Sequence, residues 1–211
     1  MYKKIPLTMI IFITFIFTSI FTYASVSNTP KASIEATVNA ILDTLKDKSL
    51  SAPVNKEKRR NKIRELIRSR FDFEEMAKRT LARHWRDRTH DERKEFVSIF
   101  SDLLESSYIT KIEAYTNEKI TFDKETLSDD GRTGVVKTTI IAANANIPID
   151  YKVIQKNNDW FVYDVVIEGV SFISTYRSQY DKIITSQSYA QLVQIMKDKL
   201  AEQTKKLSEK K

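Results

Sequence analysis

The chain has 211 residues, with 35 lysines and arginines against 28 aspartates and glutamates, so its formal net charge is +7. It contains no cysteine and only three glycines, which excludes disulfides, cysteine metal sites and the glycine-rich loops that cradle nucleotide phosphates. A hydrophobic fraction of 41% is enough to build a folded core. Thiol-dependent enzymes and glycine-loop nucleotide enzymes are therefore excluded at the outset.

Residues 1–24 have the pattern of an export signal. Two lysines precede an apolar run, and Thr22 and Ala24 supply the small-x-small pattern that signal peptidase reads. The run of about 15 apolar residues is shorter than the roughly 20 that a membrane-spanning helix needs. We therefore predict cleavage after Ala24, with an uncleaved anchor as the alternative, and a single mature domain over 25–211 that ends in a charged tail.

The next segment is predicted to form two helices. Apolar residues recur at helical spacing from Lys31 to Asp47, and a second helix is expected over 55–69. This second helix is strongly basic. It is interpreted either as a solvated helix face or as a docking surface. One alternative function is therefore a non-catalytic adaptor that uses this basic surface to hold an acidic partner, and reversing the charges of Arg59, Arg60 and Arg64 should then abolish its role.

Two further helices are marked by capping residues. Asp72 precedes a helix that is expected to stop near Trp85. Thr89 and Glu92 form a capping-box pattern and open a long helix with a broad apolar stripe. Such a stripe is more often ordinary core than a ligand wall.

After Tyr115 the hydrophobic period changes to two, which predicts an antiparallel sheet. The expected strands are 119–124, 135–143, 145–153 and 160–170. Two helices follow, one from Phe172 and one from Tyr189. The fold class is therefore α+β: a curved antiparallel sheet of about four strands, packed by N- and C-terminal helices that enclose an apolar pocket.

A search for catalytic groups gives little. Asp150 lies on the polar face of its strand, and Asp164 is expected to be a partly buried carboxylate paired with an arginine. His84 stands near a helix end, where a solvent-facing role is expected. An enzyme on this fold would need Asp164 to face a second polar group across the cavity.

The apolar residues of the sheet and helices either interdigitate as a dry core or leave a slot, and periodicity does not separate the two. The candidate slot-lining residues are Phe96, Phe100, Leu103, Leu104, Tyr108, Ile147, Ile149, Tyr151, Val153, Phe161, Tyr163, Val165, Ile167, Phe172 and Tyr176.

Two blocks of sequence resemble a known family. The block from Phe71 to Ala77, followed by Leu81 and Trp85-Arg86, looks like the central signature of the MlaC-type (toluene-tolerance auxiliary) periplasmic phospholipid-binding family. The segment 168–180 is similar to its second signature. One departure is visible, because Ala82-Arg83-His84 stands where the family usually has a glycine before the Trp-Arg pair.

The resemblance implies a periplasmic, monomeric carrier of glycerophospholipid that has no cofactor, no metal, no catalytic activity and no nucleic-acid partner. Its partners would be an inner-membrane ABC transporter with an MCE-domain ring and an outer-membrane lipoprotein–porin complex, in a system that maintains outer-membrane lipid asymmetry. A hopanoid or another apolar lipid is the alternative cargo. The slot-lining residues above would contact acyl chains, and the cations expected near the mouth are Arg83, Arg86 and Arg177.

Overall fold

The computed structural model describes residues 28–115 and 118–209, so the predicted export signal lies outside the described residues. The first four α-helices are α1 (Pro30–Lys46), α2 (Lys56–Arg70), α3 (Phe73–Leu81) and α4 (His90–Glu113). The strands are β1 (Lys119–Leu127), β2 (Thr133–Ile141), β3 (Asn146–Lys156), β4 (Asp159–Ile167) and β5 (Val170–Ser171), and the last helices are α5 (Phe172–Ser186) and α6 (Tyr189–Glu209). Among these helices none is both long and apolar enough to cross a membrane.

The helix starts follow the capping signals of the sequence. The Thr89 side chain accepts from the Glu92 backbone N–H at 3.2 Å, and the Glu92 carboxylate accepts from the Thr89 N–H at 2.7 Å, which completes the predicted capping box. The Asp72 carboxylate likewise accepts from the N–H of Glu75 and caps α3. Each of these bonds joins residues three positions apart, so the start of each helix is marked by local contacts.

The predicted helix from Asp72 to Trp85 is interrupted at Ala82. There α3 ends, and a 3₁₀ turn (Ala82–Trp85) carries the chain to Trp85. Ala82 has φ 48° and ψ −116°, a conformation that normally requires glycine. The expected single helix was therefore wrong at this point, and the departure from the family pattern falls on a residue held in a strained backbone.

The five strands form one antiparallel sheet in the order β1-β2-β3-β4-β5. The strand predicted over 160–170 ends earlier, at Ile167. Glu168 and Gly169, at φ 49° and 81°, turn the chain back into the two-residue β5. The error arose because the apolar residues continue through the turn, so the pattern alone does not show where pairing stops.

The far edge of β4 is covered by the junction between α2 and α3. The N–H of Asp72 donates to the carbonyl of Val162 at 2.9 Å, and Phe71 forms a parallel bridge with the same residue. This contact ties the helical part of the chain to the sheet.

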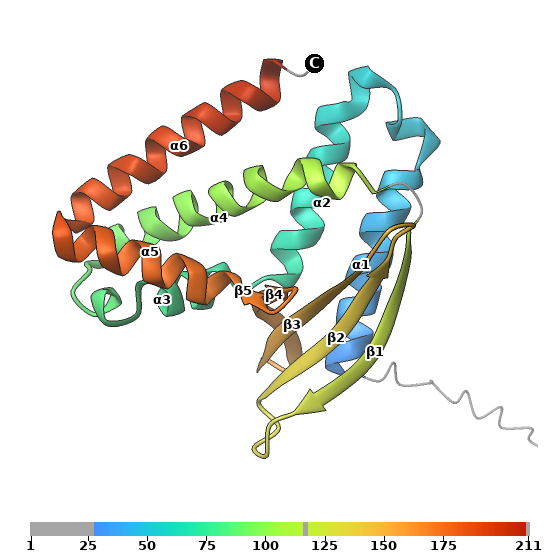
Figure 1. Cartoon of the computed structure of the whole chain (residues 1–211), viewed down its shortest axis with the longest axis horizontal. Helices are drawn as coiled ribbons and strands as arrows, with labels where there is room; N and C mark the ends of the chain where they lie inside the picture. The colour runs from blue at the N-terminus through green and yellow to red at the C-terminus, as the bar shows by residue number, and fades with distance from the viewer. Residues whose placement is uncertain (1–27, 116–117, 210–211) are drawn as a thin grey trace, which may run out of the picture.

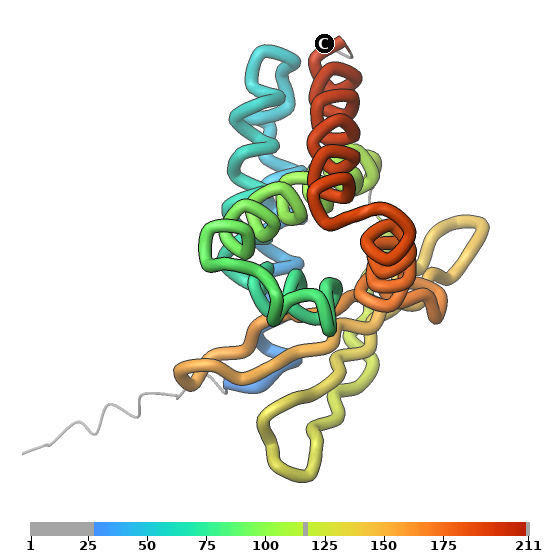
Figure 2. The backbone as a smooth tube through the Cα atoms, turned by 90° about the vertical axis from the view of Figure 1, so that its left-hand side faces the viewer, coloured from blue at the N-terminus to red at the C-terminus, as the bar shows by residue number. Residues whose placement is uncertain are grey.

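The apolar side chains gather in two clusters. The helical core lies among α3, α4, α5 and α6, whereas the sheet core lies between the sheet and α1. Figure 1 shows α1 running along the sheet while α4, α5 and α6 extend away from it, and Figure 2 shows the same separation from the side. The molecule is thus a helical layer and a sheet–α1 layer joined at β4, α2 and α4.

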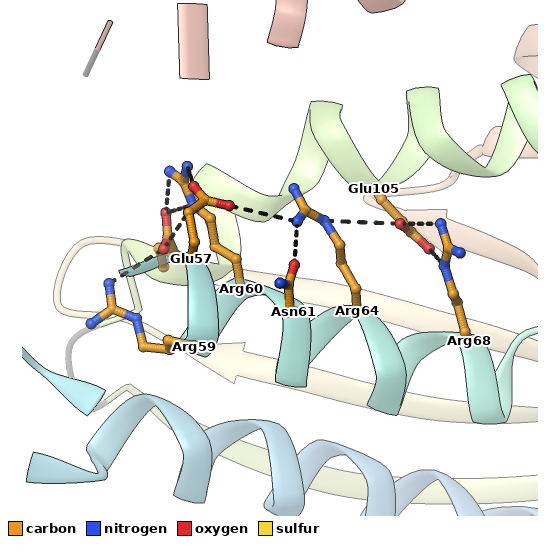
Figure 3. A network of polar contacts seen from close by, with 8 residues as sticks. Glu57, Arg59, Arg60, Asn61, Arg64, Arg68 and Glu105 are labelled. Atoms are coloured by element: carbon orange, nitrogen blue, oxygen red, sulfur yellow. Dashed lines mark hydrogen bonds and ion pairs between the residues drawn. The ribbon is translucent and has the colours of Figure 1, made fainter. Parts of the chain in front are cut away.

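Four arginines of α2 contact carboxylates of α4, whereas Lys58 and Lys62 are exposed. Arg60 has a side chain only 2% exposed, and its guanidinium contacts both carboxylate oxygens of Glu113 at 2.9–3.1 Å. Arg68 contacts Glu105 at 2.6 Å, and Figure 3 shows Arg64 between these pairs, along the side of α2 that faces α4. We call these contacts the arginine network; its members are Glu57, Arg59, Arg60, Arg64, Arg68, Asp102, Glu105 and Glu113.

The arginine network changes the interpretation of the basic helix. Burial alone would raise the pKa of Glu113, but the hydrogen bonds and charges of Arg60 and Arg59 outweigh it and hold that pKa below its ordinary value. Arg60 is neither a solvated residue nor available to an external partner. Both sequence interpretations were therefore wrong for Arg60, whose role is to fasten α2 to α4.

Candidate functional site

A cavity of about 510 Å³ lies between α1 and the sheet. Its walls come from α1, the end of α2, the last turns of α4, and strands β1 to β4. The lining is dominated by aliphatic side chains, namely Ile34, Val38, Ile41, Leu42, Leu45, Ile67, Ile112, Ile120, Ile140, Ile147, Ile149 and Ile167. A volume of this size is within the range of ligand-binding pockets.

The hollow follows from how α1 meets the sheet. Ile34, near the start of α1, is 2% exposed and belongs to the sheet core with Val136 and Val162. Further along α1, Ile41 and Leu45 face the cavity and are only partly buried. One end of α1 is therefore packed on the sheet, while the aliphatic side chains of its other end stop short of the strands opposite.

Polar groups inside the cavity already have partners. Arg70 donates to Thr37 at 3.2 Å and to Asp159 at 2.9 Å, and it also contacts the carbonyl of Trp160. The Tyr151 hydroxyl bonds to Thr138. A ligand in this space would therefore meet apolar surface rather than unsatisfied hydrogen-bonding groups.

Two tyrosines that line the cavity have raised pKa values. Burial raises the pKa of Tyr151 to about 12 and also raises the pKa of Tyr108. The charged form of a phenol is disfavoured wherever water is excluded. The hydroxyls of Tyr151 and Tyr108 are therefore both shielded from water by the surrounding protein.

Charged residues stand at the rim. Lys111, in the last turn of α4, and Glu168, in the turn after β4, both line the cavity and are exposed. The Lys111 ammonium lies 5.0 Å from the centre of the Tyr108 ring, and that ring stacks on Phe172 at 4.7 Å. Lys111 therefore lies beside a pair of stacked rings.

Five of the residues predicted to line a slot do line this cavity: Tyr108, Ile147, Ile149, Tyr151 and Ile167. Four others are buried in the helical core: Phe96, Phe100, Leu103 and Leu104. The remaining six predicted residues lie in or against one of the two cores or contact Arg70. Tyr163, Phe172 and Tyr176 pack against the helical core, Val153 and Val165 belong to the sheet core, and Phe161 lies beneath Arg70.

The cations predicted for the mouth lie elsewhere. Arg83 forms an ion pair with Asp181 at 2.9 Å, Arg177 donates to the carbonyl of Arg79, and Arg86 is exposed beyond the 3₁₀ turn. None of the three is among the cavity residues, whose cations in the described ranges are Arg70 and Lys111. Proximity to aromatic residues in the sequence does not indicate which side of a helix faces the cavity.

The largest set that the slot prediction omitted is the inner face of α1. The periodicity of Ile34, Val38 and Ile41 is visible in the sequence and predicts an amphipathic helix. It does not show that the helix covers a hollow rather than a filled core. The available signal was composition, because the lining is rich in isoleucine and leucine where the helical core is rich in rings.

Asp164 has a structural environment. It is 2% exposed, accepts from Ser171 at 2.7 Å and from the N–H of Ile173 at 3.1 Å, and pairs with Lys152 at 3.1 Å. The expected partner was an arginine, so that detail was wrong. Asp164 does not line the cavity, and its bonds hold the start of α5 to β4.

Comparison with known proteins gives a consistent result. The family described as MlaC protein matches residues 35–198. A relative from Haemophilus influenzae, named intermembrane phospholipid transport system binding protein MlaC, is 25% identical over 141 residues, which are 63% of this chain and 66% of the relative. The matched region thus spans just under two thirds of that relative's length.

A solved structure is similar over almost its entire length. It is a phospholipid-binding protein from Ralstonia solanacearum, determined in complex with a phospholipid. The TM-score is 0.75 at 23% identity, and the match covers 82% of this chain and 98% of the other. At this identity the likeness establishes the fold.

Proposed function

We propose, because this chain belongs to the MlaC family, that it is a carrier that moves phospholipid between membranes and holds the acyl chains in the cavity between α1 and the sheet. The observation that carries the proposal is the cavity itself, which has a volume of about 510 Å³ and a lining in which aliphatic side chains predominate. The names of the similar proteins from Haemophilus influenzae and Ralstonia solanacearum, which mention phospholipid transport and phospholipid binding, support it.

The physical task explains the design. Each methylene group removed from water contributes about 0.8 kcal/mol, so the tails of one phospholipid oppose transfer through water by on the order of 20 kcal/mol. A carrier lowers this barrier by offering the tails an apolar space of its own. Ile41, Leu42 and Ile149 would supply that space, while the headgroup stays at the rim.

The wider setting is part of the proposal. A chain with the export pattern of residues 1–24 would work in the periplasm, as the transport system named for the Haemophilus relative would require. We propose an inner-membrane ABC transporter with an MCE-domain ring and an outer-membrane lipoprotein–porin complex as its partners. Cleavage after Ala24 would remove Lys3 and Lys4 and leave a net charge of 33 − 28 = +5, which favours association with anionic membrane surfaces.

The proposed role is non-catalytic. A hydrolase acting on lipid in this cavity would need facing acid–base groups, and Asp164 is engaged at the start of α5. The polar side chains that do line the interior, Thr37, Arg70 and Tyr151, are bonded to other protein groups.

The test is the composition of the protein as purified. Protein produced from the full sequence and purified without detergent should yield about one phospholipid per chain on solvent extraction and mass spectrometry. A fully folded preparation free of any lipid would contradict the proposal. Another apolar lipid at the same stoichiometry, such as a hopanoid, would preserve the carrier role and replace the cargo.

A further inference from the structure

The rim of the cavity holds two opposite charges that the protein leaves unused. Within residues 28–115 and 118–209, neither Lys111 nor Glu168 forms an ion pair with any side chain, including each other. Arg70, the other cation of the lining, is committed to Asp159. The rim therefore presents one free positive and one free negative charge beside an apolar space.

We infer that this rim selects a zwitterionic phospholipid headgroup, with Lys111 contacting the phosphate and Glu168 the ammonium group. The inference rests on the proposed function, because it assigns a headgroup to the lipid whose tails occupy the cavity.

Lys111 is held where a phosphate would emerge. Its ammonium lies over the Tyr108 ring, and Tyr108 lines the cavity one helical turn before it. The aromatic contact restrains the lysine without neutralising it, so the charge stays available at the boundary between apolar wall and solvent. A phosphate joined to tails inside the cavity would reach this boundary first.

Glu168 lines the same cavity from the turn after β4. Its N–H donates to the carbonyl of Pro148 at 3.0 Å, and its φ of 49° fixes it in a tight turn. Four residues later Phe172 stacks on Tyr108, which brings the turn after β4 to the last turns of α4. The carboxylate therefore stands at the same rim as the ammonium of Lys111.

The balance of charge favours a zwitterion over an anionic lipid. Lys111 and Glu168 together add no net charge to this boundary, because one cation and one carboxylate line it there. A headgroup with a terminal ammonium places opposite charges against both Lys111 and Glu168. A headgroup with only a phosphate would meet one favourable charge, Lys111, and one repulsive charge, Glu168.

The experiment is a competition between two lipids. Protein from the full 211-residue sequence is incubated with vesicles of equimolar phosphatidylethanolamine and phosphatidylglycerol, separated from them, and its retained lipid is quantified by mass spectrometry. We expect phosphatidylethanolamine to be enriched about two- to fivefold, the effect of an ion pair near solvent. Because such a pair is screened, 1 M salt should remove most of the enrichment.

Two variants separate the roles of the charges. Glu168→Gln should bring the ratio of retained phosphatidylethanolamine to retained phosphatidylglycerol close to one. Lys111→Met should weaken retention of both lipids and change this ratio less. The controls are Glu65→Gln and Lys124→Met, which alter exposed charges outside the cavity and should leave ratio and retention unchanged.

The outcomes are distinguishable. Enrichment that Glu168→Gln abolishes supports the inference. Retained phospholipid with no preference, with a preference for phosphatidylglycerol, or with a ratio that Glu168→Gln leaves unchanged would overturn the inference and leave the carrier function standing. Failure of the unmodified protein to retain either lipid would overturn both.

Discussion

The helical core and the cavity are both apolar, but different side chains build them. In the helical core, rings interlock: Phe96 stacks on Phe100 with centroids 5.8 Å apart, and Tyr180 meets Phe96 edge-on at 5.9 Å. Around the cavity, aliphatic residues such as Ile41 and Ile149 face one another across space. Because one region is filled by packed rings and the other encloses a cavity, the two should respond differently to the same kind of mutation.

The largest difference should appear on truncation to alanine. Phe100 is 0% exposed, so Phe100→Ala removes a ring from a packed site and should lower the free energy of unfolding by about 3–5 kcal/mol. Leu42 is only partly buried against the cavity, and Leu42→Ala should cost less than about 1.5 kcal/mol. Urea denaturation measures both. Equal losses would mean that the cavity wall is as tightly packed as the helical core.

The arginine network, which fastens α2 to α4, should be nearly as sensitive to mutation as the helical core. Arg60→Met leaves Glu113 buried with only the Arg59 contact and should destabilise the protein by about 3 kcal/mol. Arg64, whose ionic contacts are 4.0 Å long, provides the matched control, and Arg64→Met should cost under about 1 kcal/mol.

The same pair predicts an acid dependence. Because the folded protein lowers the pKa of Glu113, its stabilising contribution is present above the unfolded value near 4.5 and is lost as pH falls through the folded value. Glu113→Gln should therefore flatten part of the stability loss below pH 4.5 in urea titrations. An unchanged acid profile would contradict this assignment.

A bulky substitution should have opposite consequences in the two regions. Ile99→Trp overpacks the helical core and should cost about 1–3 kcal/mol, with lipid content per folded molecule unchanged. Ile149→Trp should fill part of the cavity, cost under about 1 kcal/mol, and reduce the phospholipid retained per chain. Thermal melts and lipid mass spectrometry report the two effects. Undiminished retention in Ile149→Trp would place the acyl chains elsewhere.

The dependence of the free energy of unfolding on alkaline pH should also distinguish the cavity from the helical core. Tyr151 keeps its proton to about pH 12 in the folded state, whereas an unfolded tyrosine releases it near 10. The folded state then binds more protons between these values, so the free energy of unfolding falls as pH rises, by about 1 kcal/mol at pH 11 from this group. Tyr151→Phe should remove that part of the slope, and Tyr180→Phe, in the helical core, should remove a separate part.

The smallest expected effect is an increase in the free energy of unfolding. Ala82 occupies a backbone conformation that glycine adopts without strain, so Ala82→Gly should raise the free energy of unfolding by about 1 kcal/mol. The neighbouring Ala77→Gly, in the regular helix α3 and buried, should lower it. A loss in Ala82→Gly would show that the strain is relieved in solution.

Much of the fold was predictable because its signals are local. The capping residues Thr89 and Asp72 act on backbone groups within three residues, and the change of period after Tyr115 marks the start of the sheet. The turn at Glu168 was missed because the apolar residues run through it, and pairing with Pro148 is a tertiary contact that the segment itself does not encode.

The site was predicted only in part, for the same reason. Ile147, Ile149 and Tyr151 alternate on one strand face, so their shared side of the sheet was evident. Phe96 and Phe100 lie on an equally clear apolar face of a helix. Periodicity does not show which element that face packs against, and in the structure it packs against α5 and α6. Whether facing residues meet or leave a hollow depends on how α1 packs on the sheet, which the pattern of neither segment shows.

The most direct measurement is photo-crosslinking with a phospholipid that carries a diazirine in one acyl chain. After binding to the full-length protein and irradiation, the adducts are mapped by peptide mass spectrometry. Adducts on the α1 segment 34–45 and on the strand segments 140–151 are the result expected for tails held between helix and sheet. Adducts confined to 96–104 and 189–196 would place the tails in the helical core and contradict the account.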